Sequence, residues 1–413
     1  MSKPTTPGLL EPPAVDGAWL RLAASLLLAT IGGVGLWSSV VVLPTIEAEF
    51  GIDRGGASIP YTATLVGFAV GGVFMGRLAD RFGIVSPLML GATMLGLGYI
   101  AASQVTSYWQ FILVHALLIG ALGSSATFGP LVADISHWFL RRRGIAVAIV
   151  ASGNYLSGTI WPPILQYGIE TIGWRQSYLA VGVVCVLAML PLALLLRLRS
   201  PVESGDQPVS AHASPATMRL PPGAFQALLA FAAIACCVAM SMPQVHIVAY
   251  CADLGYGPAR GAEMLSVMLG LGVVSRLISG VIADRIGGVA TLVLGSSLQT
   301  LALIFYLPFD GLASLYIVSA IFGLSQGGIV PSYALIVREY FPAREAGARV
   351  SLVLMASVVG MALGGWISGE IYDLTGSYEA AFLNGIAWNL VNLAIAMWLL
   401  MGRMRPARQA SAA

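Results

Sequence analysis

The sequence contains little charge. Only 10% of its 413 residues are Asp, Glu, Lys or Arg, whereas 57% are hydrophobic. A soluble domain carries roughly a quarter charged residues, because it must cover its surface toward water. The shortage of charge excludes a water-soluble globular protein of this length and indicates that lipid surrounds much of the chain.

Cysteine frameworks and enzyme motifs are also missing. The four cysteines show no CxxC spacing and lie in or at the end of apolar runs, so we expect them to pack as small apolar side chains; they are Cys185, Cys236, Cys237 and Cys251. The sequence has no nucleotide-binding P-loop and no cluster of metal ligands. We therefore expect no enzyme activity, no cofactor, no metal site and no nucleic-acid partner, and any transport must draw on gradients.

Apolar runs long enough to cross a hydrocarbon core of about 30 Å are abundant. Because backbone groups in lipid must be hydrogen-bonded within the chain, these runs are expected to be helices. The sequence thus predicts an all-α polytopic membrane protein with twelve transmembrane helices, at 19–43, 58–76, 86–105, 109–134, 144–167, 175–197, 223–250, 262–282, 288–307, 312–337, 348–371 and 380–402. The polar segment 1–16 lacks the basic start of a signal peptide, so the first run should remain in the membrane.

Basic residues give these twelve spans a direction, since Lys and Arg favour cytoplasmic loops. With both termini placed in the cytoplasm, only Arg54, Arg175 and Arg260 lie outside. Seventeen lie inside: Lys3, Arg21, Arg77, Arg81, Arg141, Arg142, Arg143, Arg197, Arg199, Arg219, Arg285, Arg338, Arg344, Arg349, Arg403, Arg405 and Arg408. We therefore expect a multi-pass protein of the cell inner (plasma) membrane with both termini cytoplasmic.

The chain divides near its midpoint. A polar stretch with five prolines, 200–222, is the one long connection between spans. It predicts an N-terminal six-helix bundle (1–197), a cytoplasmic linker (198–222) and a C-terminal six-helix bundle (223–413). The two halves repeat a motif, because residues 76–83 (GRLADRFG) and 280–287 (GVIADRIG) share five of eight positions at an offset of 204 residues. This repeat indicates pseudo-symmetric halves.

The repeated motif resembles the signature between the second and third helices of the major facilitator superfamily, whose two six-helix halves rock about a central site. Ile84 and Val85 stand where that signature usually has basic residues. An aspartate at a helix end can pair with arginine and with a neighbouring helix N-terminus. The resemblance implies a gate, made of Asp80, Arg81, Asp284 and Arg285. The alternative is that these residues only form tight charged turns.

Shorter motifs resemble monocarboxylate transporters and their oxalate/formate-exchanging relatives. Residues 138–146 (WFLRRRGIA) look like the signature of that branch at its fifth helix, and Ser275-Arg276 resembles its buried arginine segment. Residues 16–19 (DGAW) match only half of the signature before the first helix. This chain also has Gly272 and Val42 where animal members carry an aspartate and a lysine. The resemblance implies a small organic anion as substrate, with proton coupling arranged differently from the animal members.

Arg276 is the clearest candidate for binding that anion. It lies thirteen residues from Glu263 and eight from Asp284, deep in its span at about 1.5 Å per residue. An arginine within the membrane costs roughly 2.5 kcal/mol or more unless it meets a polar cavity or partner. No acidic residue lies at a comparable depth, and the guanidinium group fits a carboxylate with two hydrogen bonds. The alternative is an arginine satisfied by carbonyl groups of the span 312–337 or by Gln326.

His246 is the candidate for proton coupling. It follows Pro243, which should break the span 223–250, and broken helices often mark transporter sites. Histidine titrates near neutral pH and can donate to a carboxylate. Bacterial relatives of the monocarboxylate branch similarly pair a histidine of the seventh helix with the arginine of the eighth. The alternative is a packing histidine near the outer end of its helix.

Further candidates for substrate contact are Phe128, Asn154, Trp161 and Gln326, each of which could equally serve packing. Asn154 and Trp161 are seven residues apart and so share a helix face. His115, by contrast, is expected to be a hydrogen-bonded core histidine.

Together these features predict a secondary transporter of a monocarboxylate such as lactate or pyruvate, or of a short dicarboxylate. We expect alternating access, proton-coupled symport and a functional monomer in the lipid bilayer. The alternatives are an anion exchanger of the oxalate/formate type, an efflux transporter of drugs or metabolites, and a sensor without flux. Efflux of cations would call for an acidic residue in the cavity, and none lies at a depth comparable to that of Arg276 in the predicted spans.

Overall fold

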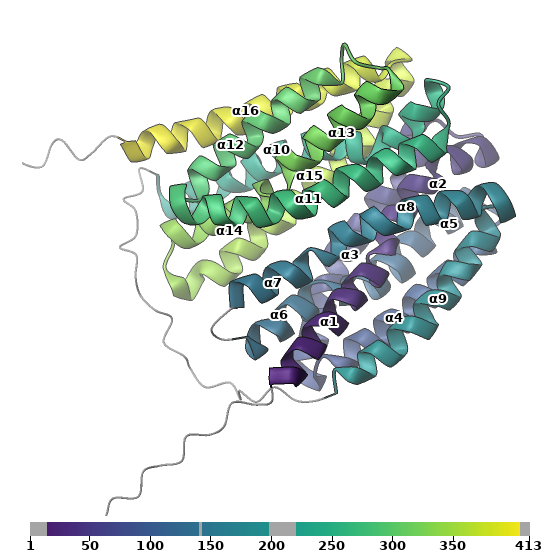
Figure 1. Cartoon of the computed structure of the whole chain (residues 1–413), viewed down its shortest axis with the longest axis horizontal. Coiled ribbons are helices and arrows are strands. Elements are labelled where there is room, and N and C mark those ends of the chain that lie inside the picture. Colours follow the sequence, from purple (N-terminus) through teal and green to yellow (C-terminus); the bar gives the residue numbers. More distant parts are fainter. Residues whose placement is uncertain (1–14, 140–142, 198–219, 405–413) are drawn as a thin grey trace, which may run out of the picture.

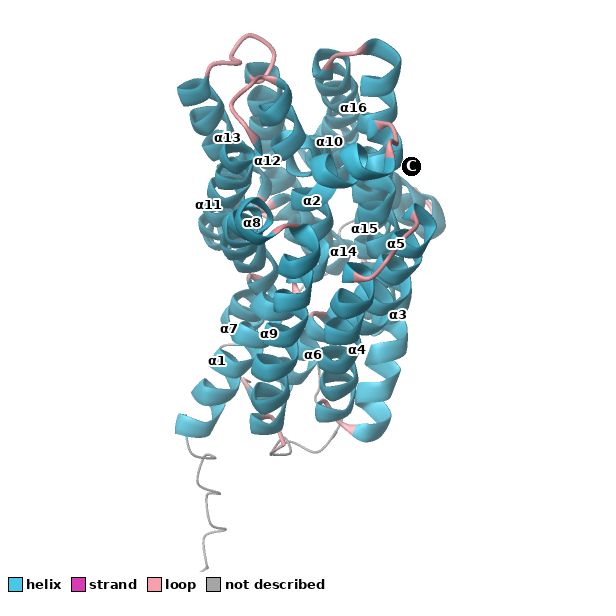
Figure 2. Cartoon of the chain, turned by 90° about the vertical axis from the view of Figure 1, so that its right-hand side faces the viewer, coloured by secondary structure: helices cyan, strands magenta, loops and turns pink. Residues whose placement is uncertain are grey.

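The computed structural model describes residues 15–139, 143–197 and 220–404, and this part of the chain consists of helices joined by loops and turns (Figure 2). The helices are α1 (Val15–Gly32), α2 (Val34–Phe50), α3 (Arg54–Phe82), α4 (Val85–Ser103), α5 (Tyr108–Val114), η1 (His115–Gly123), η2 (Ser124–Thr127), α6 (Gly129–Trp138), α7 (Arg143–Ala151), α8 (Gly153–Ile172), α9 (Trp174–Leu195), α10 (Pro222–Asp253), α11 (Pro258–Ile286), α12 (Gly288–Phe305), α13 (Leu312–Gln326), α14 (Ile329–Tyr340), α15 (Ala343–Thr375) and α16 (Tyr378–Met404).

The helices form two groups, with α1–α9 in one and α10–α16 in the other (Figure 1). Both ends of the described chain, the start of α1 and the end of α16, lie at the same end of the bundle. We call this the terminal end. The opposite end, which carries the short connections 51–53 and 376–377, is called the distal end.

The predicted spans correspond to these helices, several of which are interrupted. Eleven stretches in the described residues are long and apolar enough to cross a membrane. The remaining expected span, 144–167, is occupied by α7 and α8. Interruptions also separate α1 from α2 and α13 from α14, and the fourth span runs through a π-helical turn and a 3₁₀ turn. The fold class is the predicted one.

The predicted break at Pro243 is wrong. α10 continues through Pro243 from Pro222 to Asp253. Proline removes one backbone hydrogen bond, but membrane helices tolerate it where neighbouring helices and serine side chains satisfy the freed groups. Here every residue from Ala235 to Ala249 is buried. Dense packing therefore holds this helix together.

The duplicated motif folds in the same way in both halves. Gly83 and Gly287 end α3 and α11 with φ of 81° and 82°, a region that glycine adopts without strain. Their N–H groups donate to Ala79 and Ala283 at 2.8 and 2.9 Å. The same turn thus closes the same helix of each half, as duplication predicts.

Two apolar cores hold the bundle. One contains residues of α1–α9 alone, including Trp161. The other joins helices α10–α16 to one face of α2, α3 and α8 through residues such as Trp37, Tyr61 and Tyr155. The faces of α2, α3 and α8 that belong to this second core form the junction between the halves, where an alternating-access transporter places its substrate site.

Candidate functional site

Arg276 lies at the junction of the halves. It is on α11, and its Nη1 donates to the carbonyl of Ala151 at the end of α7, at 3.0 Å. Its Nε lies 3.4 Å from the carbonyl of Gly327 between α13 and α14, and its guanidinium carbon lies 4.3 Å from the ring centroid of Tyr155 on α8. Among the described residues no carboxylate forms an ion pair with Arg276. Its two carbonyl partners lie where α7 and α13 are interrupted, so the helix breaks expose the acceptors that hold it.

Gln326 lies next to this arginine. Gly272, one turn before Arg276 on α11, packs closely against both Tyr155 and Gln326. A Cβ on Gly272 would lie 2.6 Å from the ring of Tyr155 and 3.6 Å from Gln326 Nε2. The side chain of Gln326 is buried, and its Oε1 accepts from Gln244 Nε2 on α10 at 2.5 Å. Arg276, Tyr155, Gln326 and Gln244 therefore form one cluster, built from both halves.

The amide pair has unused hydrogen-bonding capacity. Gln244 Oε1 and Gln326 Nε2 are buried and have no partner. Turning both amides over would exchange the two ends but would still leave one acceptor and one donor. Buried polar groups are nearly always satisfied, so an orphan donor and acceptor beside a cation indicate a place for a bound polar molecule.

His246 belongs to a different network. It is 0% exposed, its Nε2 lies 2.7 Å from the carbonyl of Gly365 on α15, and its Nδ1 lies 3.1 Å from the hydroxyl of Tyr378 on α16. Gln244 and His246 are two residues apart on α10 and so point to different sides of it. The structure brings Gln326 to Arg276, whereas both ring nitrogens of His246 are engaged elsewhere.

Arg54, at the start of α3, is the centre of that second network. It is 6% exposed and makes two hydrogen bonds to Asp253 at the end of α10, at 3.0 and 3.1 Å. Its Nη1 also donates to Tyr378 Oη at 2.6 Å. Its Nε lies 2.7 Å from a carboxylate oxygen of Glu47 on α2, an ion pair that is not aligned as a hydrogen bond.

The α3 backbone joins the same network. Asp373 on α15 accepts from the N–H groups of Arg54 and Gly55 at 2.9 and 2.5 Å. A Cβ on Gly369 would lie only 2.8 Å from the Cα of Gly55, so α3 and α15 touch backbone to backbone. We call Glu47, Arg54, Asp253, Asp373 and Tyr378 the distal latch, because Arg54 links the two halves at the distal end.

The other predicted contact residues divide between the two cores. Asn154 is next to Tyr155, its carbonyl accepts from Trp37 Nε1 at 3.1 Å, and its buried side-chain oxygen has no partner. Phe128 packs on Phe68, with ring centroids 6.1 Å apart, at the irregular start of α6. Trp161 instead donates to the carbonyl of Thr30 at 3.1 Å within the N-terminal half. Asn154 thus lies beside the Arg276 cluster, and Trp161 packs away from it.

His115 is a buried core histidine, as expected. Its Nδ1 lies 3.2 Å from the Thr64 hydroxyl, and its ring packs on Phe111 and Tyr178.

The predicted gate residues lie at the terminal end without ion pairs. Asp80, Arg81, Asp284 and Arg285 are all exposed. None of the four has an ion-pair partner among the described residues, and Arg81 stacks on its neighbour Phe82. The polar contacts between the halves named above lie at Arg276 and toward the distal end.

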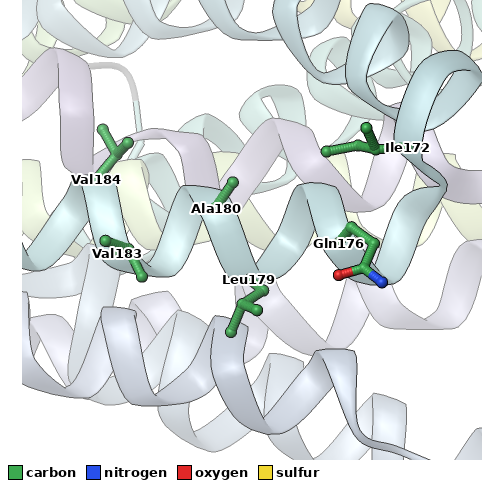
Figure 3. A pocket seen from close by; sticks show the side chains of 6 residues that line it. All are labelled: Ile172, Gln176, Leu179, Ala180, Val183 and Val184. Carbon is green, nitrogen blue, oxygen red and sulfur yellow. The ribbon is translucent and has the colours of Figure 1, made fainter.

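The groove in Figure 3 has another character. It lies along α9 and is lined by Leu179, Ala180, Val183 and Val184, with Gln176 and Ile172 at one end. Its large apolar side chains are exposed on the outside of the bundle. Such a surface suits lipid chains and offers no group to bind a charged substrate.

Sequence reasoning missed the distal latch and two members of the Arg276 cluster. The sequence predicts only that Arg54 lies in an outside loop, and it does not single out Glu47, Asp253, Asp373 or Tyr378. Tyr155 and Gln244 looked like ordinary helix residues. The one signal for them in the sequence is that each lies close to a predicted site residue. Tyr155 follows Asn154, and Gln244 precedes His246 by two positions.

Comparison with known families gives a consistent result. A profile of the Major Facilitator Superfamily matches residues 25–315 and 290–413. Monocarboxylate transporter 13 of Bos taurus is 30% identical over 382 residues, which cover 90% of this chain and 87% of that protein. The agnestins efflux protein AgnL12 of Paecilomyces divaricatus is 24% identical, over 96% of this chain and 90% of that protein. Relatives of this kind are membrane transporters.

Solved structures show the same fold at low sequence identity. The nucleoside transporter NupG has a TM-score of 0.73 at 14% identity, covering 92% of this chain and 99% of its own. A bacterial homologue of the human lysosomal transporter Spinster, in an inward-facing and unoccupied conformation, has a TM-score of 0.67 at 15% identity, covering 95% and 96%.

Proposed function

We propose, on the premise that this chain belongs to the Major Facilitator Superfamily and is a membrane transporter rather than an enzyme, that it carries small monocarboxylates by alternating access. Arg276 is the carboxylate-binding group in this proposal. The name of the bovine relative agrees with this substrate class.

The observation that carries the proposal is the situation of Arg276. It lies well inside α11, at the junction of the halves, and no carboxylate of the described residues neutralises it. An unpaired charge within the membrane is costly, and carbonyl groups satisfy it only in part. A planar carboxylate accepts two hydrogen bonds from a guanidinium group, so an entering anion would compensate the charge. Because Ala151 and Tyr155 come from the other half, the bound anion would also favour closure of the halves around it.

The rest of the cluster supplies a second polar contact. Gln244 and Gln326 offer one donor and one acceptor, which suits a hydroxyl or keto oxygen beside the carboxylate of a lactate-like or pyruvate-like acid. Asn154 adds another free acceptor. Phe128 and Trp161 contribute packing in this proposal, Phe128 near the junction and Trp161 within the N-terminal half.

Alternating access requires a gate at each end. The distal latch closes one end in this structure. Asp80, Arg81, Asp284 and Arg285 close the terminal end in the opposite state, when they acquire partners. We propose that the terminal end faces the cytoplasm of a plasma membrane, that a monomer suffices for transport, and that His246 carries the coupled proton.

The test is uptake of radiolabelled lactate, pyruvate, formate and oxalate into proteoliposomes, with and without an inward proton gradient. Arg276→Gln should abolish uptake of every acid that the parent protein carries. Arg276→Lys should reduce uptake strongly, because an ammonium group cannot form the paired hydrogen bonds of a guanidinium group. Arg260→Gln is the matched control, since Arg260 lies on the same helix but forms its ion pair with Glu263 at the exposed distal end.

Uptake that is driven by the gradient and lost in Arg276→Gln supports proton-coupled carboxylate symport. Uptake that requires a preloaded counter-anion would make the protein an exchanger and remove the need for a proton on His246. Normal uptake in Arg276→Lys would overturn the assignment of the carboxylate site.

A further inference from the structure

The hydrogen bonds around His246 fix its protonation pattern in this conformation. The carbonyl of Gly365 can only accept, so the Nε2 that lies 2.7 Å from it carries hydrogen. A neutral imidazole then has a bare Nδ1, which accepts the hydroxyl hydrogen of Tyr378 at 3.1 Å. The Tyr378 oxygen in turn accepts from Arg54 Nη1 at 2.6 Å. These bonds form one directed chain, from Arg54 through Tyr378 to His246 and on to Gly365.

This chain has no place for a second proton on His246. A hydrogen on Nδ1 would face the hydroxyl hydrogen of Tyr378, and Tyr378 would have to turn its hydrogen toward the guanidinium group of Arg54, which can only donate. Protonation of His246 therefore breaks the chain at one of its two links, and it adds a positive charge on the far side of Tyr378 from Arg54.

Charge balance points in the same direction. Asp253, Asp373 and Tyr378 belong to the C-terminal half, whereas Arg54 and Glu47 belong to the N-terminal half. When the distal end opens, Arg54 departs with Glu47 and leaves the two aspartates without a cation. A proton on His246, which is in their own half, supplies the missing positive charge.

We propose that the distal latch is a proton-operated gate, in which Tyr378 relays the protonation of His246 to Arg54 and so opens the distal end. The proposal rests on the proposed function only in assigning the coupled proton to His246. Binding of the proton and opening of the gate are linked, so each favours the other. Protons on the distal side would thus prepare the transporter to load substrate from that side.

The charged and titratable groups around the chain of His246, Tyr378 and Arg54 come from five helices. α3 contributes Arg54, α2 contributes Glu47, α10 contributes Asp253, α15 contributes Asp373 and Tyr372, and α16 contributes Tyr378. Because Arg54 faces three carboxylates, it stays charged throughout, and His246 is the group of this set whose ordinary titration range lies near neutral pH.

The test measures the distal opening directly. Spin labels at Thr106→Cys and Asp310→Cys, exposed sites in the distal loops of the two halves, report the distance across the distal end by pulsed EPR. The four native cysteines are buried and should label slowly. We expect the population of long distances to rise several-fold between about pH 7.5 and about pH 5.5, on either side of the histidine range.

Three variants make the test specific. His246→Gln can donate to Gly365 and accept from Tyr378 but cannot take a proton, so its distances should stay short at both pH values. Tyr378→Phe keeps the ring without the relay, so its opening should no longer depend on pH. His115→Gln, the other histidine buried in a span, is the matched control and should respond like the parent protein.

The proposal is overturned if the pH response of the label distances persists unchanged in His246→Gln or Tyr378→Phe. It is also overturned if the label distances of the parent protein do not change with pH. Carboxylate counterflow that depends on Arg276 would leave the proposed function intact in either case. Conversely, pH-dependent opening without flux of any tested acid would support the latch and overturn the carboxylate assignment.

Discussion

The two ends of the bundle use their charged residues differently. At the distal end, Arg54 of one half is buried among Asp253, Asp373 and Tyr378 of the other. At the terminal end, the duplicated Asp-Arg pairs are solvent-facing and unpaired among the described residues. The distal end is joined by buried, directional contacts, whereas the four residues of the terminal motif form no ion pair with another described residue.

This difference shows that a repeated sequence motif does not reveal which end is closed. The motif marks two equivalent turns, one in each half, and duplication guarantees that both fold alike. Arg54 has no counterpart at the corresponding place in the second half, where α11 begins with Pro258-Ala259-Arg260 and Arg260 pairs locally with Glu263. A single cation between two halves is an asymmetric device, so internal repetition cannot signal it.

Removing the asymmetric cation should have the largest effect. Arg54→Gln leaves Asp253 and Asp373 without their cation, and breaking a buried pair costs about 3–5 kcal/mol. The Asp253 side chain is 31% exposed, so we expect the lower end, about 3 kcal/mol, or a shift of roughly 100-fold toward a distal-open state. The terminal counterpart Asp80→Asn should leave the distal distances unchanged, because Asp80 has no ion-pair partner here, and should slow transport instead.

EPR distances between the labels at residues 106 and 310 give the first result, and carboxylate counterflow gives the second. If Arg54→Gln keeps the short distance and Asp80→Asn lengthens it, the roles that we assign to the two ends are reversed.

A smaller effect on the distal distance is expected from glycine-to-alanine changes. These changes alter the packing of the helices without altering any charge, so they test the steric contribution to closure alone. A Cβ on Gly369 would lie 2.8 Å from the Cα and 2.9 Å from the backbone nitrogen of Gly55. Gly369→Ala should therefore push α15 from α3, at the cost of about 1–3 kcal/mol that overpacking usually carries. Gly280→Ala, near the terminal end of α11, meets nothing within 4 Å and should be silent. Equal label distances in the two variants would show that close backbone approach does not hold the distal end shut.

The sequence predicted the fold because lipid imposes simple rules. Span length, helix formation and the alternation of basic loops follow from composition. The duplicated turn at Gly83 and Gly287 could be recognised because the two motifs share five of eight residues. The depth of Arg276 was also predictable by counting residues along one helix. What it contacts was not, because Ala151 lies 125 positions away and is exposed only by a helix break that no proline marks.

Other parts of the site escaped for equally physical reasons. Pro243 predicted a break in α10, but packing on all sides keeps the helix continuous. His246 stands near the distal end of its helix, and its partners Gly365 and Tyr378 lie more than a hundred residues away in the sequence. Long-range pairing between helix ends depends on how the halves are tilted against each other, and local patterns carry no information on that tilt.

The smallest expected change in the distal-open population comes from Glu47. The direction of this change is informative, because it should be opposite to that of Asp253→Asn. Its ion pair with Arg54 lies within the N-terminal half and does not cross the junction, so it competes with Asp253 and Tyr378 for the same guanidinium group. Glu47→Gln should leave Arg54 more firmly bound to the C-terminal half, so the distal-open population should fall at acidic pH. The fall should be only a few-fold, because the Glu47 carboxylate is 25% exposed and its ion pair with Arg54 is correspondingly weak. The matched change Asp253→Asn removes a carboxylate from the same arginine but across the junction, so it should raise the open population instead. EPR distances at about pH 5.5 measure both changes. Two shifts in the same direction would mean that the total negative charge around Arg54, rather than the half that carries it, sets the gate.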